Sequence, residues 1–498
     1  MKSLIKLSFH LLLLLLLFAC NKDDINISEE KIQFISFEFL QENNAKLLSK
    51  DINCAIEENS IKILIPHVLK DKNLIANFTF EGEKVFVGEQ EQISGESIND
   101  FSKPVEYVIE NASGEKKVYK VEVSAFTGLP IIFIQTENHA DIVSKDEYLN
   151  ATIQILGDSL SFEGNMRIKG RGNSTWGLPK KPYKLKFDKK ESLLGYPKDK
   201  EWVLLANYTD KTNLRNETAF YLGRISELEW TPRSHFVEVF INDVYNGVYQ
   251  LCEQIKISES RVNVTDNGYL LEVDQQNRLD PDDIFFTTDR ILLNIKDPDV
   301  ESNSEQFLFV KNYVTEAENA LYSDIFTDPN NGYAKYLDVN SFVDWYLVNE
   351  ITKNNDAIFF SSCYMNLIPG GKIKMGPIWD FDIALGNINY NNNQDPTGFW
   401  VKNSIWIQRL LEDPAFVQKV KDRFKYFKSK ENEIYIYINN NANNLHYSII
   451  ENNNCWGTLY NQTSPNYAVW GSYENEIQYM KNWLNKRLIW LDQAFSQM

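Results

Sequence analysis

A change in hydrophobic periodicity divides the chain, and it restricts the possible fold more than any other feature of the sequence. Between residues 31 and 126, apolar side chains recur at every second position in short runs, as in Ile61, Ile63 and Ile65. Turn-forming residues separate several of these runs, at intervals of roughly 8–12 residues, which is typical of an all-β sandwich. We therefore predict a β-sandwich module over residues 31–126, serving as a spacer or a weak recognition module.

A second domain with a mixed pattern is predicted after the turn-forming segment 127–130. Strand patterns come first, over residues 166–169, 183–187, 203–205, 236–241 and 248–251. Helical periodicity predicts a first helix at 214–227, between two of these strands, and three later helices at 341–353, 404–427 and 474–494. Ser341 is the expected N-cap of its helix, and the Asn-rich pieces near Asn391 and Asn440 are expected to be solvated loops.

The N-terminus has the pattern of a secretion signal. Two lysines precede the apolar run Leu11–Leu17, which is too short to span a bilayer. The run ends in Leu-Phe-Ala followed by Cys20, which resembles the lipobox of bacterial lipoproteins. That resemblance implies a signal peptide over residues 1–19 and a lipid anchor on Cys20. The alternative is a plain signal peptide with an incidental cysteine.

Residues 20–30 are predicted to be the tether between the lipid and the first domain. The segment Asn21–Asp24 combines a lysine with two acids, similar to an export tag of some Gram-negative lipoproteins. We therefore expect the protein in the cell envelope, anchored to the outer membrane, and exposure at the surface stays open.

Charge and cysteine content exclude two classes of site. The 498 residues include 51 Lys and Arg against 69 Asp and Glu, a net charge of −18 that repels phosphate backbones, so no nucleic acid partner is expected. Apart from Cys20, the cysteines are widely spaced and form no metal-binding pattern. They are predicted to be four small buried residues without disulfides, at Cys54, Cys252, Cys363 and Cys455.

Three charged residues stand out in the strand-rich part of the second domain. Arg171 lies between two glycines, in a loop that is either an anion site or a plain hairpin turn. Lys184 shares one face of its strand with Lys186, as expected equally of a functional site and of a solvated edge strand. Glu253 closes an apolar strand and needs a cationic partner, either Lys184 or Arg215.

Acidic residues follow in the helical part. Asp380 and Asp382 come after Gly-Pro-Ile-Trp, and on an extended segment they would point to the same side, about 7 Å apart at Cα. Two such carboxylates can share one magnesium ion, with Asn or phosphate oxygens completing its coordination. The alternative is a pair of surface acids at a strand end, which the surrounding Trp379 and Phe381 make less favourable.

Several segments in the same order resemble the CotH (spore-coat protein H) family over about residues 130–425. They read RIKGRGNSTW, KKPYKLKF, EWVLLANYTDKTNLRNETAFYLGR, FVEVFINDVYNGVYQLCEQI and GPIWDFDIALGN. The resemblance implies an α+β domain with an atypical protein kinase fold over residues 130–498. The module in front is similar to the immunoglobulin-like sandwiches of many surface lipoproteins.

The same resemblance implies an activity and the residues that carry it. The family is expected to transfer the γ-phosphoryl group of ATP to Ser or Thr of a protein, with Mg²⁺. Asp356 would accept the proton of the substrate hydroxyl, and Asp380 and Asp382 would hold the metal. The implied nucleotide-binding residues are Lys184, Glu253 and Arg171.

Two further functions remain open on the sequence. A lipoprotein outside the cytoplasmic membrane meets little ATP, and no G-x-G-x-x-G loop precedes the lysine strand. The kinase-like fold could instead be reused as a non-catalytic surface module that binds protein or glycan. A third hypothesis is metal-assisted hydrolysis of a surface polymer by the same acids.

Overall fold

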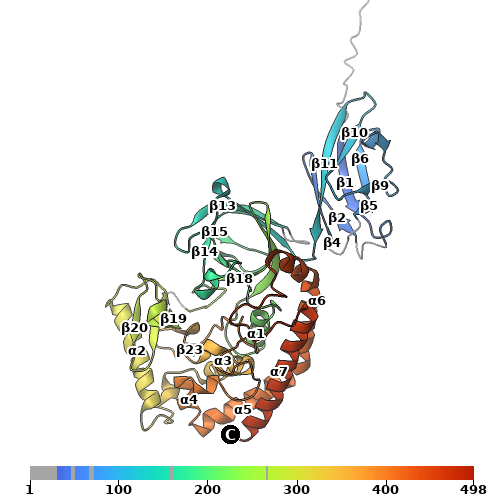
Figure 1. The fold of residues 1–498 in the computed structure, drawn as a ribbon. Helices are drawn as coiled ribbons and strands as arrows, with labels where there is room; N and C mark the ends of the chain where they lie inside the picture. Colours follow the sequence, from blue (N-terminus) through green and yellow to red (C-terminus); the bar gives the residue numbers. More distant parts are fainter. Residues whose placement is uncertain (1–30, 46–50, 67–71, 157–160, 265–266) are drawn as a thin grey trace, which may run out of the picture. The chain divides into compact units, whose positions relative to one another are not determined.

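The computed structural model describes residues 31–45, 51–66, 72–156, 161–264 and 267–498. The chain divides into two compact units, one ending at Phe126 and the other beginning at Thr127, and each is considered separately (Figure 1). The predicted signal peptide, Cys20 and the tether lie outside the described residues. In the ranges given above, no helix has the length and apolar character needed to cross a membrane.

The first unit is built of strands, as the alternating pattern predicted. Its sheets have the orders β2–β1–β6, β3–β4–β11–β10–β7–β8 and β5–β9 (Figure 1). Their aromatic core includes Phe34, Phe37 and Tyr107, whose rings meet edge to face. The strands are β1 (Gln33–Phe39), β2 (Ile52–Asn53), β3 (Ala55–Glu57), β4 (Ser60–Pro66), β5 (Asn73–Ile75), β6 (Asn77–Glu81), β7 (Lys84–Val87), β8 (Gln90–Glu91), β9 (Ile98–Asp100), β10 (Val105–Glu110) and β11 (Lys116–Phe126). The strand-rich character is confirmed, and the immunoglobulin-like assignment stays a prediction.

The second unit opens with a closed barrel of seven strands, in the order β12–β13–β14–β15–β16–β18–β17. Alternate side chains from all seven strands, such as Leu185, Trp202 and Tyr249, form one buried cluster. Lys184 lies on the opposite face of β15 from Leu185, as the alternation predicted. The strands are β12 (Ile131–Thr136), β13 (Leu149–Leu156), β14 (Phe162–Gly170), β15 (Tyr183–Glu191), β16 (Asp199–Leu205), β17 (Ser234–Ile241) and β18 (Val244–Glu253).

A five-stranded sheet and a set of helices follow the barrel, so that the second unit is of mixed α/β class (Figure 1). The sheet has the order β20–β21–β19–β22–β23, with β19 (Tyr269–Val273), β20 (Phe285–Thr287), β21 (Leu292–Asp297), β22 (Cys363–Leu367) and β23 (Lys374–Met375). The helices are α1 (Arg215–Arg224), α2 (Glu305–Tyr322), α3 (Val339–Thr352), α4 (Ile405–Leu410), α5 (Pro414–Ser429), α6 (Glu431–Trp456) and α7 (Tyr473–Ser496). Helix α3 is buried along nearly its whole length. It packs against α1, α5 and α7.

Two predicted helix boundaries are wrong, and capping explains both. Helix α3 begins at Val339 because Asp338 is the N-cap, and its Oδ1 accepts a hydrogen bond from the Ser341 amide at 2.9 Å. The single helix expected over 404–427 is two helices, α4 and α5. Asp413 caps the second, whose first residue is Pro414, and a proline at that position starts a helix without losing a hydrogen bond.

The Asn-rich segment near Asn440 is part of helix α6, so the predicted loop is wrong there. Ile434, Ile438 and Leu445 lie on one face of this helix and are buried, and that burial outweighs the low helix propensity of asparagine. The segment near Asn391 is irregular, as predicted, but Asn393 within it is buried rather than solvated.

The four described cysteines are free thiols. Cys252 and Cys363 are buried, as predicted for small apolar residues. Cys54 is half-buried and Cys455 is exposed, so the prediction of four buried cysteines is wrong for these two.

Candidate functional site

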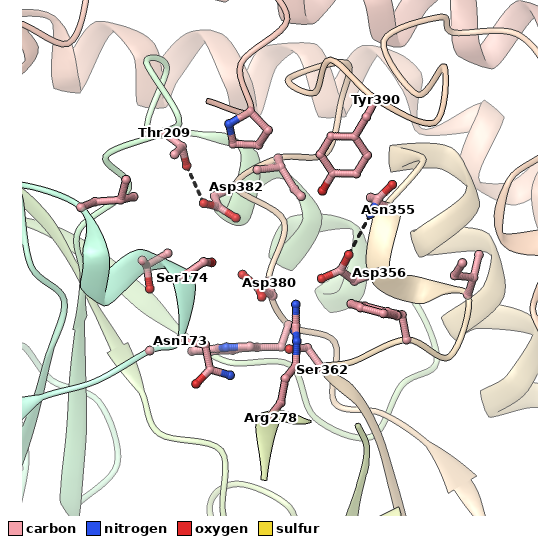
Figure 2. Close-up of a pocket in the computed structure, with 18 of the residues that line it drawn as sticks. Asn173, Ser174, Thr209, Arg278, Asn355, Asp356, Ser362, Asp380, Asp382 and Tyr390 are labelled. Carbon is pink, nitrogen blue, oxygen red and sulfur yellow. Dashed lines mark hydrogen bonds between the residues drawn. The ribbon is translucent and has the colours of Figure 1, made fainter. Parts of the chain in front are cut away.

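Four carboxylates and two guanidinium groups line one cavity of about 810 Å³ in the second unit. The acids are Asp356, Asp380, Asp382 and Glu272, and the cations are Arg171 and Arg278. Figure 2 shows the three aspartate side chains directed into the same space, with Arg278 reaching it from the opposite side to Thr209. We refer to this cavity as the acid cavity.

Asp380 and Asp382 lie on a turn, not on the extended segment that the sequence predicted. Strand β23 ends at Met375, and Asp380 has a φ of +69°, in the left-handed region that aspartate tolerates better than most residues. Both side chains nevertheless line the acid cavity. Phe381 between them is fully buried and anchors the turn in the apolar core.

Hydrogen bonds from distant segments hold this turn. The Phe381 amide donates to Asn216 Oδ1 at 2.7 Å, and the Thr209 hydroxyl donates to Asp382 Oδ2 at 2.6 Å. Asn387 Nδ2 donates to the backbone carbonyls of Asp382 at 2.8 Å and Thr209 at 3.0 Å. Thr209 therefore orients the Asp382 carboxylate, while Asn216 in helix α1 and Asn387 hold the backbone of the turn.

Arg215 also hydrogen-bonds the backbone of the same turn. Its Nε donates to the carbonyl of Ala384 at 3.0 Å, and its Nη1 pairs with Asp210, both side chains being buried. The expectation that Arg215 pairs with Glu253 is therefore wrong. Asp210 and Arg215 therefore have a structural role: Arg215 is held by its buried ion pair with Asp210 and hydrogen-bonds the backbone just after Asp382.

Asp356 follows helix α3, in a short 3-10 helix over Asn355–Ala357. Its Oδ1 accepts a hydrogen bond from Asn355 Nδ2 at 2.8 Å (Figure 2). Its Oδ2 accepts one from the Ser361 hydroxyl at 3.3 Å. Asn355 is itself held through its Oδ1, which accepts from Asn391 Nδ2 at 2.9 Å. These bonds orient the carboxylate and leave each of its oxygens with accepting capacity.

The clustered acids repel one another. Burial, together with the nearby Asp382 and Asp356 carboxylates, raises the pKa of Asp380 to about 8, although Arg171 and Arg278 act to lower it. The pKa of Asp382 is also raised, first by burial, while the hydrogen bond from Thr209 lowers it. A cation bound between these groups would relieve both the burial cost and the repulsion.

The two arginines supply positive charge on the other walls of the acid cavity. Arg171 lies 5.5 Å from the ring centroid of Trp379, and burial lowers its pKa. Arg278 donates from Nη1 to the Ser361 hydroxyl at 2.6 Å and lies 4.8 Å from the Phe360 ring centroid. Within the part of the chain that the structure describes, neither guanidinium forms an ion pair, so both keep donors for an anionic ligand.

The structure does not bring Lys184 and Glu253 together. Lys184 Nζ lies 3.3 Å from Glu201 Oε1 on the neighbouring strand. Glu253 accepts two hydrogen bonds from the Arg233 guanidinium, at 2.9 and 2.7 Å, and a third from the Arg233 backbone amide at 3.0 Å. The predicted pairing is therefore wrong, and neither residue is among those lining the acid cavity. The glutamate that lines the acid cavity is Glu272, whose pKa burial raises to about 7.

The donor set suits magnesium bound together with phosphate. Among the described residues, no group of three or more His, Cys, Asp or Glu side chains is placed to hold a metal ion alone. Mg²⁺ is usually bound in proteins by one or two carboxylates, with water and substrate phosphates completing its octahedron. Asp380 and Asp382 could supply such carboxylates, since both line the acid cavity.

Sequence reasoning missed several residues of this site. Thr209 and Asn216 lie in the motif EWVLLANYTDKTNLRNETAFYLGR. The signal that could have identified them is that they are polar residues next to apolar ones, in a segment that contacts the site. Asn355 directly precedes Asp356 and could have been found by that proximity. Arg278 and Tyr390 line the acid cavity from loops whose sequence carries no distinguishing pattern.

Comparison with known proteins separates a weak likeness from a firm one. None of the curated proteins matches this chain. A solved structure described as a candidate glycoside hydrolase from Bacteroides thetaiotaomicron is 14% identical, and the match covers 57% of this chain and 88% of that chain. Its TM-score of 0.18 is too low to show a shared fold. The model of the family described as CotH kinase protein matches residues 168–491, well over half of the sequence. The chain therefore belongs to the CotH kinase protein family.

Proposed function

We propose that this protein is a magnesium-dependent phosphotransferase that moves the γ-phosphoryl group of ATP to Ser or Thr of a protein. The observation that carries the proposal is the acid cavity itself. Four acids converge there with two arginines that form no ion pair among the described residues, in a member of the CotH kinase protein family. Phosphoryl transfer depends mainly on positioning and on neutralising charge, and such a set of groups supplies both.

Asp380 and Asp382 would hold the metal ion. Their carboxylates line the acid cavity, Thr209 orients that of Asp382, and Asn216 holds the backbone between the two acids, which supports a site preorganised for a cation. The ion would neutralise negative charge on the phosphates when bound. Arg171 and Arg278 would bind the remaining phosphate oxygens, since guanidinium donors match phosphate geometry.

Asp356 would accept the proton of the acceptor hydroxyl. It lies on a different element from the metal-binding pair, which separates the roles of proton acceptor and ion ligand. Asn355 and Ser361 orient its carboxylate without neutralising it. A positioned carboxylate of this kind typically accelerates transfer by about 10²–10⁴-fold.

The proposed place of action is the bacterial cell envelope, with the chain tethered to the outer membrane through a lipid on Cys20. The acceptor would then be a protein, or a surface polymer, within reach of the tether. This part of the proposal is supported by the lipobox-like sequence before Cys20.

The test incubates the purified full chain with γ-labelled ATP, a serine-containing acceptor and Mg²⁺. Label should pass to protein in the presence of Mg²⁺ and should not pass when EDTA removes the ion. Release of labelled phosphate without labelled protein would instead indicate hydrolysis. Absence of any Mg²⁺-dependent nucleotide binding would overturn the proposal and favour the non-catalytic surface module.

A further inference from the structure

A second cavity, of about 820 Å³, lies beside helix α7 and has no part in the acid cavity. Aromatic rings form its floor: Trp470 stacks on Tyr479 with centroids 4.7 Å apart at 27°, and Tyr467 stacks on Tyr479 at 6.5 Å and 24°. Trp470 is 39% exposed and Tyr467 is 45% exposed. These three rings form a partly exposed platform, which we call the aromatic platform.

Side-chain amides surround the aromatic platform. Asn475, Gln478 and Asn482 lie on one exposed face of α7, at i, i+3 and i+7, and Asn392 and Gln394 face the same cavity from a loop. Gln478 Nε2 donates to Asn482 Oδ1 at 2.7 Å, which leaves the Gln478 oxygen and the Asn482 amino group available. The rim therefore offers both donors and acceptors.

The cavity carries almost no net charge. Asp395 and Lys486 are the charged residues among those that line it, and their charges are opposite. This is unusual in a chain with a net charge of −18, and it differs from the acid cavity, where charged groups dominate. A polar but uncharged ligand is therefore favoured over a nucleotide or an acidic polymer.

The aromatic platform is rigidly held. Tyr479 donates from its hydroxyl to the carbonyl of Gly386 at 3.1 Å, and Trp483 Nε1 beneath it donates to the carbonyl of Gln394 at 2.8 Å. Lys353 Nζ, which is buried, donates to the carbonyls of Asp395 at 2.8 Å and Thr397 at 2.7 Å, fixing the loop on the other side. A preformed surface binds with a smaller loss of conformational entropy.

We propose that this cavity binds a neutral oligosaccharide chain. A sugar ring presents an apolar C–H face that stacks on an exposed aromatic ring, and its hydroxyls need donors and acceptors around that ring. The aromatic platform and its amide rim supply both, in a volume within the range of ligand sites. The proposal does not depend on phosphoryl transfer, because no residue of the acid cavity takes part.

The test is affinity electrophoresis of the full chain through gels that contain a neutral β-glucan, α-glucan, mannan, xylan or galactan. At least one polysaccharide should retard the protein, and calorimetric titration with its oligosaccharide should give the affinity. Trp470→Ala and Tyr467→Ala should each weaken binding by about tenfold or more. Tyr460→Ala is the matched control, because Tyr460 is 68% exposed and lies outside the cavity.

Two further measurements distinguish binding of a neutral sugar from binding of a charged ligand and from binding in the acid cavity. Binding should be nearly independent of NaCl concentration, because the ligand is uncharged. It should also persist in Asp380→Asn, so that loss of phosphoryl transfer and loss of sugar binding are distinguishable. If Trp470→Ala fails to fold, Gln478→Ala on the exposed face of α7 replaces it and should also weaken binding.

Either of two results would overturn the proposal. One is the absence of retardation by all five neutral polysaccharides. The other is retardation that Trp470→Ala, Tyr467→Ala and Gln478→Ala leave unchanged while the variants remain folded.

Discussion

The backbone amide of Phe381 helps to fix the positions of the two acids of the turn, Asp380 and Asp382. Its hydrogen bond to Asn216 lies between Asp380 and Asp382, and the buried Phe381 ring keeps the turn from moving away from the core. The positive φ of Asp380 is stabilised by these contacts, since isolated residues seldom adopt it. At this scale, the site depends on neutral residues as much as on its acids.

Replacing each acid separately should divide the activity into binding and transfer. Asp380→Asn removes a negative ligand and should weaken Mg²⁺-nucleotide binding. Asp356→Asn should leave that binding nearly intact and lower transfer by about 10²–10⁴-fold. Calorimetric titration with Mg²⁺-nucleotide and a labelled-transfer assay measure the two effects.

Thermal unfolding provides the control for these two variants. If both acids were only structural, both substitutions would lower Tm and neither would change nucleotide affinity selectively. That result would contradict the assigned roles.

Arg278 should contribute to phosphate binding, because its guanidinium lines the acid cavity and lowers the pKa of Asp380. Arg278→Gln removes this charge and should weaken nucleotide binding by about tenfold, with little change in Tm. Arg167→Gln is the matched control, since the Arg167 side chain is 41% exposed and outside the cavity. Equal affinities for the two variants would exclude the role of Arg278.

Among the elements, helix α6 packs against barrel strand β18, and a buried lysine contributes to this contact. Lys180 Nζ donates to Asn452 Oδ1 on α6 at 2.8 Å and to the carbonyl of Val248 on β18. Its ammonium group lies 4.4 Å from the ring centroid of Tyr249, near the buried Glu238. Burial lowers the pKa of Lys180 to about 7, although Glu238 opposes this change.

The buried Lys180 should make the free energy of unfolding of the second unit depend on pH. The pKa of Lys180 is depressed in the folded state relative to 10.5, so between about pH 7 and 10.5 the unfolded chain binds more protons. The contribution of Lys180 to the free energy of unfolding should therefore rise with pH across that window, and be lost as pH falls to 7. Lys180→Met should remove this rise.

Tm values from pH 7 to 10 for the wild type, Lys180→Met and Lys425→Met measure the effect. Lys425 is exposed on α5, so its variant should keep the wild-type slope. An unchanged slope in Lys180→Met would contradict the assignment.

For the whole molecule, the division at Phe126 and Thr127 predicts two independent folding units. The first unit has its own aromatic core, separate from the clusters of the second. A fragment of residues 31–126 should therefore unfold in one cooperative thermal transition. A fragment with no such transition would show that the boundary is wrong.

The tether is a property of the whole molecule as well. If Cys20 is acylated, the full chain should incorporate labelled fatty acid and fractionate with membranes. Cys20→Ala should lose the label and leave soluble or unprocessed protein. A correctly cleaved Cys20→Ala protein that still fractionates with membranes would refute the lipid anchor.

Local pattern was sufficient for much of the fold. Alternating and helical periods depend on neighbouring residues alone, and they predicted the strand-rich character of the first unit, most barrel strands and helices α1 and α7. The same reasoning failed at Ser341 and in α6, where a nearby cap and the burial of an apolar face outweighed the propensities of single residues.

The sequence by itself determined which acids could form a site, because Asp356, Asp380 and Asp382 stand beside recognisable motifs. Only the tertiary structure decided their partners. Glu253 meets Arg233 because β18 lies beside β17, and Lys184 meets Glu201 because β15 lies beside β16. Strand order and register arise from long-range packing, and periodicity carries no information about either. For the same reason, Arg278 and the aromatic platform could be found only once the chain was folded.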